Sequence, residues 1–508
     1  MPAEIRGYLA QRDNDSLMQW LQKIGRSNPE ALQLPLLLAG ARELGWSQRE
    51  TEKLEVFVYY HRGDMRTTFE RASRYVGEAD FDHDMAITAI LALYHLGEFD
   101  TAYEWLLRVR HRESEFVHRM DYAVVATLTC LAAGRVREAK PYADAAWRLA
   151  NGNPVAALNA YAVFFELGDM ESFAAVREQI VQGKISVDQA GFSLAIPELA
   201  QDHYQEGFRL LELRYQMFEA HRYLNCALFD RPRWKDENLQ GKTLLVSAEQ
   251  GLGDTVQMAR YLPGLECIGA SRIVMETQPE TLTLLRHNFP GVEIVAREFG
   301  RTPPVAFDLW IGAMSLPHVL GATEENIPGR GGYLRVPPES ATYWRERVSG
   351  LASGDRPRIG LAWSGSPVHR GDRRRSIPFS QMMDAIRGVN ADFFALQVHV
   401  PEERPDSIID VSEEMITLAD TAALIAEMDL VITVDTSVVH LAGAIGKETW
   451  LLLPYRYEWR WGLEGEKNRW YDSVHLFRQK THGDWSYPME EVFRRRLPNT
   501  TFERRRRQ

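Results

Sequence analysis

Residues 430–444 read Leu-Val-Ile-Thr-Val-Asp-Thr-Ser-Val-Val-His-Leu-Ala-Gly-Ala, and this stretch decides the fold class of the second half of the chain. The first five residues are mostly β-branched and apolar, which is typical of a strand buried on both faces. Asp435 ends this strand, and the apolar residues that follow return at helical spacing. A buried strand that runs directly into a helix predicts an α/β fold with a parallel sheet.

Further strand-like segments alternate with helical segments on both sides of this stretch. The segment 331–338, Gly-Gly-Tyr-Leu-Arg-Val-Pro-Pro, separates them into two series. We therefore predict two Rossmann-like lobes, 239–337 and 338–495, that bind ligands at the carboxyl ends of their strands. The predicted strands are 243–247, 272–276, 292–295, 307–311, 358–363, 392–397, 430–434 and 449–453.

The segment 1–215 shows almost no strand signal and consists of helical stretches joined by short turns. Gly63, Gly97, Gly134 and Gly168 each end one helical stretch and precede another, at nearly equal intervals along the chain. Glycine suits the left-handed residue that ends a helix, and paired helices with a period of about 34 residues, as here, are typical of tetratricopeptide repeats. We predict an α-solenoid over residues 1–215 that binds a protein partner; an irregular helical bundle is the alternative.

Composition excludes several classes of protein. The 508 residues carry a formal charge of −11, which argues against a general nucleic-acid binder. The three cysteines are far apart and form no CxxC pair, so a disulfide framework and a structural zinc site are not expected. No apolar run reaches the roughly 18 residues that span a bilayer, and the N-terminus does not resemble a signal peptide. We expect a cytoplasmic protein, with a connector at 216–238 and a basic tail at 496–508.

The first candidate site is the turn Gly251-Leu-Gly-Asp254, between the strand 243–247 and a helix. Free amides at the start of a helix bind anions. The turn lacks the lysine of a Walker loop and the third glycine of the dinucleotide fingerprint. The residues alone allow two interpretations of Asp254: a helix N-cap, or a general base at the mouth of a cleft.

Two stretches in the second series have the composition of a phosphate site. Thr436 and Ser437 start a helix, where hydroxyls and free amides can hold phosphate oxygens, and His440 follows about one turn later. The segment Trp363-Ser364-Gly365 ends a strand and precedes a basic loop, whose arginines suit a diphosphate. The alternatives are capping by Asp435, a core histidine and a solvated charged loop.

Together these motifs resemble the bacterial heptosyltransferase-like glycosyltransferases of family 9, which adopt the GT-B arrangement of two facing Rossmann lobes. The match runs from about Leu239 to Phe493 and is most specific in the segments 251–254 and 435–442. The resemblance implies that Asp254 is the catalytic base and that the second lobe binds a nucleotide-sugar donor. It also implies that neither a metal ion nor a cofactor is needed.

The predicted donor-binding residues are Gly251, Gly253, Trp363, Ser364, Gly365, Arg370, Arg373, Arg375, Gln397, Asp435, Thr436, Ser437 and His440. Weaker candidates, for contact with the acceptor or the sugar, are Gln257, Trp459 and Arg460. The residues leave open which arginine of the basic loop contacts phosphate.

With its helical repeats, the whole chain is similar to bacterial proteins that join tetratricopeptide repeats to this transferase module. Some of these proteins are flagellin glycosyltransferases, so the resemblance implies a protein acceptor presented by the repeats, with flagellin as the leading candidate. The first lobe is short for the family, which favours the repeats as the acceptor-binding part. The alternatives are an enzyme directed at a glycolipid or lipopolysaccharide, a non-catalytic repeat scaffold, and an O-linked N-acetylglucosamine transferase.

Overall fold

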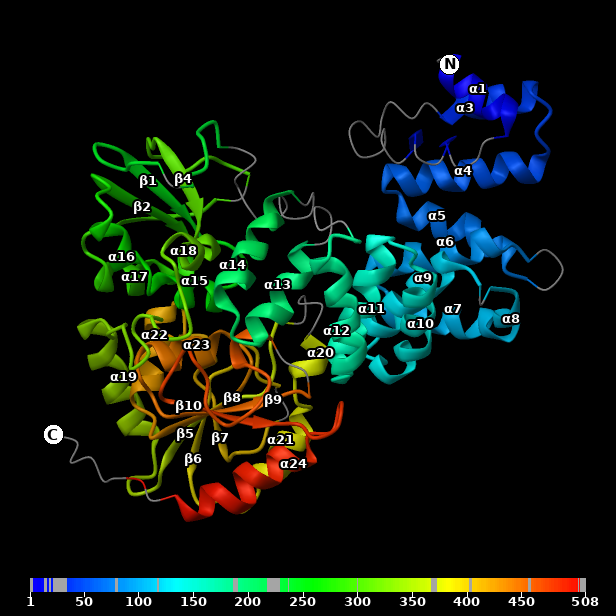
Figure 1. Cartoon of the computed structure of the whole chain (residues 1–508). Helices are drawn as coiled ribbons and strands as arrows, with labels where there is room; N and C mark the ends of the chain where they lie inside the picture. Colours follow the sequence, from blue (N-terminus) through cyan, green and yellow to red (C-terminus); the bar gives the residue numbers. More distant parts are fainter. Residues whose placement is uncertain are drawn as a thin grey trace. The chain divides into compact units, whose positions relative to one another are not determined.

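The chain divides into two units, Met1–Val187 and Asp188–Gln508 (Figure 1). The computed structural model describes residues 3–12, 16–17, 20–21, 34–77, 81–116, 118–185, 191–216, 229–235, 237–298, 300–366, 372–401, 404–455, 458–500 and 502. The described part of the first unit is helical, and the second unit contains two parallel sheets. The predicted fold class, helical repeats followed by two Rossmann-like lobes, is confirmed.

The helices of the first unit form pairs across short turns. All four glycines that were predicted to end the first helix of a pair have a positive φ, between 71° and 81°. The structure thus confirms the helix pairs and their period, while their assignment to the tetratricopeptide family stays a prediction. The helices are α1 (Ala3–Gln11), α3 (Leu34–Glu43), α4 (Gln48–Arg62), α5 (Met65–Ala72), α6 (His83–Leu96), α7 (Phe99–Val109), α8 (Glu113–Phe116), α9 (Met120–Ala132), α10 (Val136–Leu149), α11 (Pro154–Leu167) and α12 (Met170–Val181).

One further helix pair, α13 (Gly191–Ala200) and α14 (Tyr204–Leu211), belongs to the second unit. Its turn residue is Asp202, which follows Gly168 by one more repeat period and has a φ of 63°. A Cβ at Gly207 would lie 2.5 Å from Cγ of Leu199, so glycine allows the two helices to approach closely. The division between the two units lies after residue 187, while the helical segments continue to residue 216, close to the end of the predicted repeat region at 215. The sequence analysis placed this pair within the repeat region 1–215 but named no turn for it, because the turn has no glycine; the regular spacing of the turns could have revealed it.

The first lobe is a four-stranded parallel sheet in the order β3-β2-β1-β4. Its direction of winding reverses between β1 and β4, which places a topological switch point at their carboxyl ends. The strands are β1 (Thr243–Ser247), β2 (Arg272–Thr277), β3 (Glu293–Ala296) and β4 (Leu309–Gly312). The helices of this lobe are α15 (Leu252–Ala259), α16 (Leu262–Cys267), α17 (Leu282–Asn288) and α18 (Leu316–Val319).

The second lobe is a six-stranded parallel sheet in the order β10-β9-β8-β5-β6-β7, with its switch point between β5 and β8. The short strand β7 and the last strand, β10, were not predicted. The strands are β5 (Arg358–Ala362), β6 (Asp392–Ala395), β7 (Ile408–Ile409), β8 (Leu430–Val434), β9 (Thr449–Leu453) and β10 (Val474–Arg478). The helices are α19 (Pro338–Leu351), α20 (Asp372–Arg375), α21 (Phe379–Ile386), α22 (Leu418–Ala426), α23 (Ser437–Ala444) and α24 (Ser486–Glu490).

Other predictions concern the chain as a whole. Within the described ranges, no helix combines the length and the apolar character that crossing a membrane requires. Cys130 and Cys267 are free thiols, and Cys226 lies outside the described residues. Most of the predicted connector and of the basic tail also lie outside them, but Leu497, near the start of that tail, is buried in the core of the second lobe.

Candidate active site

The strand order of the second lobe brings two of the predicted motifs together. Ligands of doubly wound sheets bind where the winding reverses, outside the carboxyl ends of the strands. In this lobe that point lies between the neighbouring strands β5 and β8. β5 leads into the segment 363–365 and β8 leads into the segment 435–437, so both stretches that were predicted to hold phosphate lie at one switch point.

Asp435 lies at the end of β8, and the capping role considered for it belongs to Thr436. The hydroxyl of Thr436 accepts a hydrogen bond from the backbone N–H of Val438 at 3.3 Å, which caps α23. Asp435 is buried, and burial raises its pKa, while the charges of Arg375 and Arg460 act in the opposite direction. The interpretation of Asp435 as the helix cap is therefore wrong, and its buried carboxyl faces two arginines.

His440 is a buried residue in the first turn of α23. Its Nδ1 lies 3.0 Å from the hydroxyl of Tyr471, and its ring stacks on Trp461 with centroids 5.4 Å apart. Burial lowers the pKa of His440 well below its usual range, and the nearby Arg460 lowers it further. The imidazole is therefore neutral, and the structure shows it as a buried packing residue; a contact with the donor stays a prediction.

Arg375 is the arginine of the basic loop that the structure places beside the switch point. A Cβ at Gly365 would overlap the side chains of Arg375 and Asp372, so this loop lies directly on the turn after β5. The Nε of Arg375 donates to Asp372 at 3.2 Å. Arg370 and the side chain of Arg373 lie outside the described part of the chain.

Gln397 and Trp363 have structural roles in the second lobe. Gln397 is buried, and its Oε1 accepts hydrogen bonds from the backbone N–H groups of Trp363 and Ser364 at 2.9 and 3.0 Å. Its Nε2 donates to the hydroxyl of Ser364 at 2.9 Å. Gln397 therefore fixes the turn after β5, while the indole of Trp363 packs against Phe379 in the core.

The glycine-rich turn of the first lobe reaches the second lobe at the start of α15. The backbone N–H of Gly251 donates to Oδ2 of Asp254 at 2.9 Å, so the carboxylate accepts a hydrogen bond from the residue that precedes the helix. A Cβ at Gly253 would lie 2.7 Å from the ring of His440 and 3.3 Å from Cα of Ser437. Gly253 thus allows α15 and α23, one from each lobe, to meet.

A buried guanidinium joins Asp254 to the second lobe. Arg460 lies in the 3₁₀-helix η10 (Trp459–Trp461), which follows β9, and only 5% of its side chain is exposed. Its three nitrogens donate to Asp254, Gln257 and Glu458. Its guanidinium carbon lies 4.3 Å from the ring centroid of Trp459. The weak candidates Gln257, Trp459 and Arg460 therefore do gather around Asp254.

Glu458 also belongs to this cluster, although it was not among the predicted site residues. Besides its ion pair with Arg460, it accepts a hydrogen bond from the backbone N–H of that residue at 3.1 Å. Burial raises the pKa of Glu458 to about 7, with Arg460 lowering it and the charge of Asp435 raising it. An acidic residue two positions before an arginine, after a strand end, was the available signal.

The switch point of the first lobe is filled by side chains. Glu249, which follows β1, is 2% exposed and accepts from Arg214 at 3.0 and 2.8 Å and from the backbone of Met314 at 2.8 Å. Arg214 also donates to Ser315 at 2.7 Å. Arg214 belongs to the segment after α14, so a part of the chain that precedes the lobe occupies the place where a ligand would bind.

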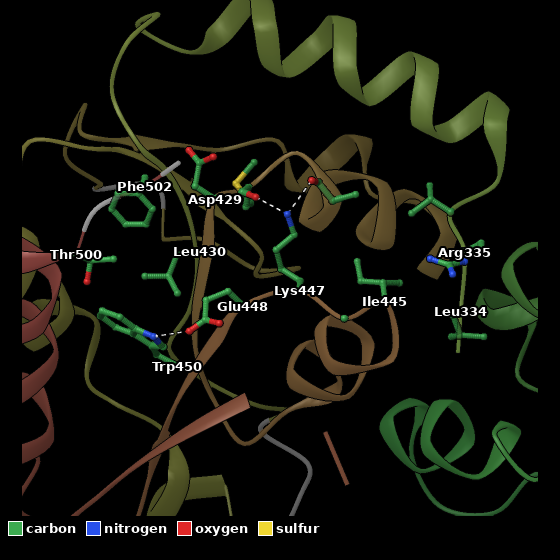
Figure 2. A pocket seen from close by; sticks show the side chains of 14 residues that line it. Leu334, Arg335, Asp429, Leu430, Ile445, Lys447, Glu448, Trp450, Thr500 and Phe502 are labelled. Atoms are coloured by element: carbon green, nitrogen blue, oxygen red, sulfur yellow. Dashed lines mark hydrogen bonds between the residues drawn. The ribbon is translucent and has the colours of Figure 1, made fainter. Parts of the chain in front are cut away.

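A cavity of 610 Å³ lies elsewhere in the second lobe (Figure 2). Leu430 and Trp450, which line it, stand near the amino ends of β8 and β9. Lys447 points into the same region and donates to the backbone carbonyls of Ala426 and Met428 at 2.9 and 2.5 Å. Because this cavity lies at the opposite end of the strands from the switch point, it is not the predicted donor site.

No family model matches this chain. Protein FlbA from Caulobacter vibrioides (strain ATCC 19089 / CIP 103742 / CB 15) is 28% identical over 365 residues, which cover 64% of this chain and 58% of FlbA. The match therefore spans less than two thirds of that relative's length.

Two solved structures are similar at low sequence identity. The glycosyl transferase family 9 protein from Veillonella parvula DSM 2008 shares 15% identity at a TM-score of 0.34, covering 48% of this chain and 87% of that one. A mutant of the Thermobaculum terrenum O-GlcNAc transferase shares 11% identity at a TM-score of 0.34, covering 89% and 92%. At such scores these likenesses carry no argument, and the fold assignment rests on the strand order of this chain.

Proposed function

We propose that this protein is a glycosyltransferase that moves a sugar from a nucleotide-sugar donor to a protein acceptor, with flagellin as the leading candidate. One observation carries the proposal. The switch point of the second lobe has hydroxyls, helix amides and Arg375 on one side, and Asp254 of the first lobe is joined to the same lobe through Arg460. This arrangement suits an anionic donor beside a carboxylate base.

The chemistry follows from these groups. Arg375 and the amides at the start of α23 would hold the donor phosphates and stabilise the negative charge that develops on the leaving group. The carboxylate of Asp254 would take the proton of the acceptor hydroxyl, while the oxygen of that hydroxyl attacks the anomeric carbon of the donor sugar. The bond between that carbon and the phosphate oxygen breaks, and the nucleotide leaves with the electron pair.

Metal independence is part of this proposal, since Arg375 and the helix amides would carry the charge of the phosphates. Turnover that survives EDTA would support this part, and turnover that EDTA abolishes and a divalent cation restores would contradict it. A cytoplasmic location stays a prediction.

The first unit offers a groove for the acceptor. A cavity of 470 Å³ lies among α3, α4 and the helical segment after α5, where Trp46 and Tyr75 stand beside charged side chains of both signs. Aromatic rings with charged groups around them suit an extended peptide. The filled switch point of the first lobe also supports an acceptor that is presented by another part of the chain.

The test uses the full-length chain in two steps. Thermal-shift measurements with ADP, UDP, GDP and CMP identify the nucleotide, and intact-mass measurements on purified flagellin with the matching nucleotide sugars then detect transfer. A mass increase of one sugar per modified site is expected. Donor hydrolysis without transfer to flagellin would point to another acceptor, such as a glycolipid, and no nucleotide shift with any probe would favour a non-catalytic scaffold.

A further inference from the structure

The surroundings of Arg460 differ from those of an ordinary surface arginine. A buried guanidinium is costly unless charged partners compensate it. Here two carboxylates and one amide oxygen surround it, and one carboxylate comes from each lobe. These contacts place Arg460 where the Gly251–Asp254 turn of the first lobe meets the loop after β9 of the second.

The contacts of Asp254 show what Arg460 does to it. Arg460 donates to Oδ1, and the backbone N–H of Gly251 donates to Oδ2. The carboxylate is therefore held from two sides and has a fixed orientation. Each carboxylate oxygen can accept about two hydrogen bonds, so Asp254 keeps capacity to accept a proton from an acceptor hydroxyl.

The second carboxylate fixes Arg460 from the side of the second lobe. Glu458 accepts from the same guanidinium and also from the backbone N–H of Arg460 at 3.1 Å. Arg460 is therefore held by its own lobe while it holds Asp254 of the other.

Packing holds this arrangement in place. Trp459, which stacks on Arg460, makes edge-to-face contacts with Phe208 of α14 and with Trp470, at centroid distances of 5.7 and 5.5 Å. The helix pair α13–α14 therefore supports the 3₁₀-helix that carries Arg460.

We propose that Arg460 is a positioning residue of the transfer reaction, which holds Asp254 in the orientation for proton uptake, and that Glu458 holds Arg460 in place. This inference rests on the proposed function, because it takes Asp254 as the base.

The test compares the wild type with Arg460→Gln, Arg460→Lys and Glu458→Gln in the full chain. We expect Arg460→Gln to lower kcat about 100-fold, the scale of a misplaced catalytic group, with little change in KM for the donor. Arg460→Lys should recover part of kcat, since it keeps the charge but not the three directed hydrogen bonds. Arg347→Gln, which removes an exposed ion pair with Glu414, is the matched control and should keep wild-type kcat.

The comparison of kcat with KM separates this role from a structural one. Glu458→Gln keeps an oxygen that can accept from Arg460, so its kcat should fall less than that of Arg460→Gln. An active wild type with an unchanged kcat in Arg460→Gln would overturn the inference and leave the proposed function standing.

An inactive wild type would contradict the proposed function instead. In that case, hydrogen exchange at the first turn of α15 decides whether Arg460 holds Asp254. Faster exchange in Arg460→Gln than in Arg347→Gln supports the positioning, and equal exchange overturns it.

Discussion

The two switch points of the second unit share a topology and differ in what occupies them. In the first lobe, Arg214, Glu249 and Ser315 are buried and bonded to one another. In the second lobe, Ser364, Thr436 and Ser437 at the corresponding place are only partly buried. Topology thus provides a possible binding place in both lobes, but the side chains fill one and leave polar groups accessible in the other.

Asp254 gives the largest expected effect, because it is the first-lobe residue that serves the second switch point. Asp254→Asn should lower the transfer rate by about 100- to 10,000-fold, the range of general base catalysis. Asparagine keeps an oxygen for the N–H of Gly251, and Glu458 still compensates the buried Arg460, so the chain should still fold. Transfer kinetics together with the thermal unfolding midpoint check this, and near-normal turnover would exclude Asp254 as the base.

Arg214 tests whether the first switch point is structural. Removing one partner of a buried ion pair leaves the other charge uncompensated, so Arg214→Ala should lower the free energy of unfolding by about 3–5 kcal/mol. Denaturant unfolding measures this value. Arg209→Ala, at an exposed ion pair with Glu206, should change it by less than about 1 kcal/mol. Equal effects of the two substitutions would show that the first switch point does not depend on this pair.

Arg375 tests whether the second switch point binds the phosphates of a nucleotide. A hydrogen bond to a charged group contributes about 1.5–3 kcal/mol, so Arg375→Ala should weaken binding of the preferred nucleoside diphosphate about 10- to 150-fold. Arg374→Ala, at an exposed position next to it, is the control. Calorimetry with the nucleotide measures both affinities. Unchanged affinity in Arg375→Ala would move the phosphate contact to another arginine of the loop.

Local patterns in the sequence were sufficient to predict the strands of both lobes except β7 and β10, and the helix pairs whose turn is a glycine. Gly97 and Gly168 could be placed because a left-handed residue at a helix end is a local requirement. The motif after β8 was recognisable for the same reason, since strand, turn and helix are contiguous there.

The contacts that fill one switch point and serve the other could not be predicted from local patterns. Glu249 and Arg214 are 35 residues apart, and Arg460 lies 206 residues from Asp254. Neither spacing corresponds to a period of a helix or strand, so only the packed structure shows these pairs. The same holds for Gln397, whose side chain completes the turn after the neighbouring strand β5.

The smallest expected effect is a pH dependence of stability with opposite sign at the two switch points. Arg214, Ser315 and Arg233 together hold the pKa of Glu212 below its usual value of 4.5 against the opposing effect of burial. The unfolded chain then binds the proton more tightly, so this stability is present above pH 4.5 and is lost as the pH falls below it. Glu212→Gln should remove that acid-side loss.

Glu458 should act in the other direction, because burial raises its pKa from 4.5 to about 7. The folded chain binds the proton more tightly, so the contribution of Glu458 to the unfolding free energy falls as the pH rises from about 4.5 to 7 and is constant above that window. Glu458→Gln should flatten this part of the stability curve and leave the region below pH 4.5 as in the wild type. Denaturant midpoints at half-unit pH intervals measure both windows. If both substitutions changed the unfolding free energy in the same pH range, the two carboxylates would have the same electrostatic environment. That result would contradict the difference between a filled first switch point and an accessible second one.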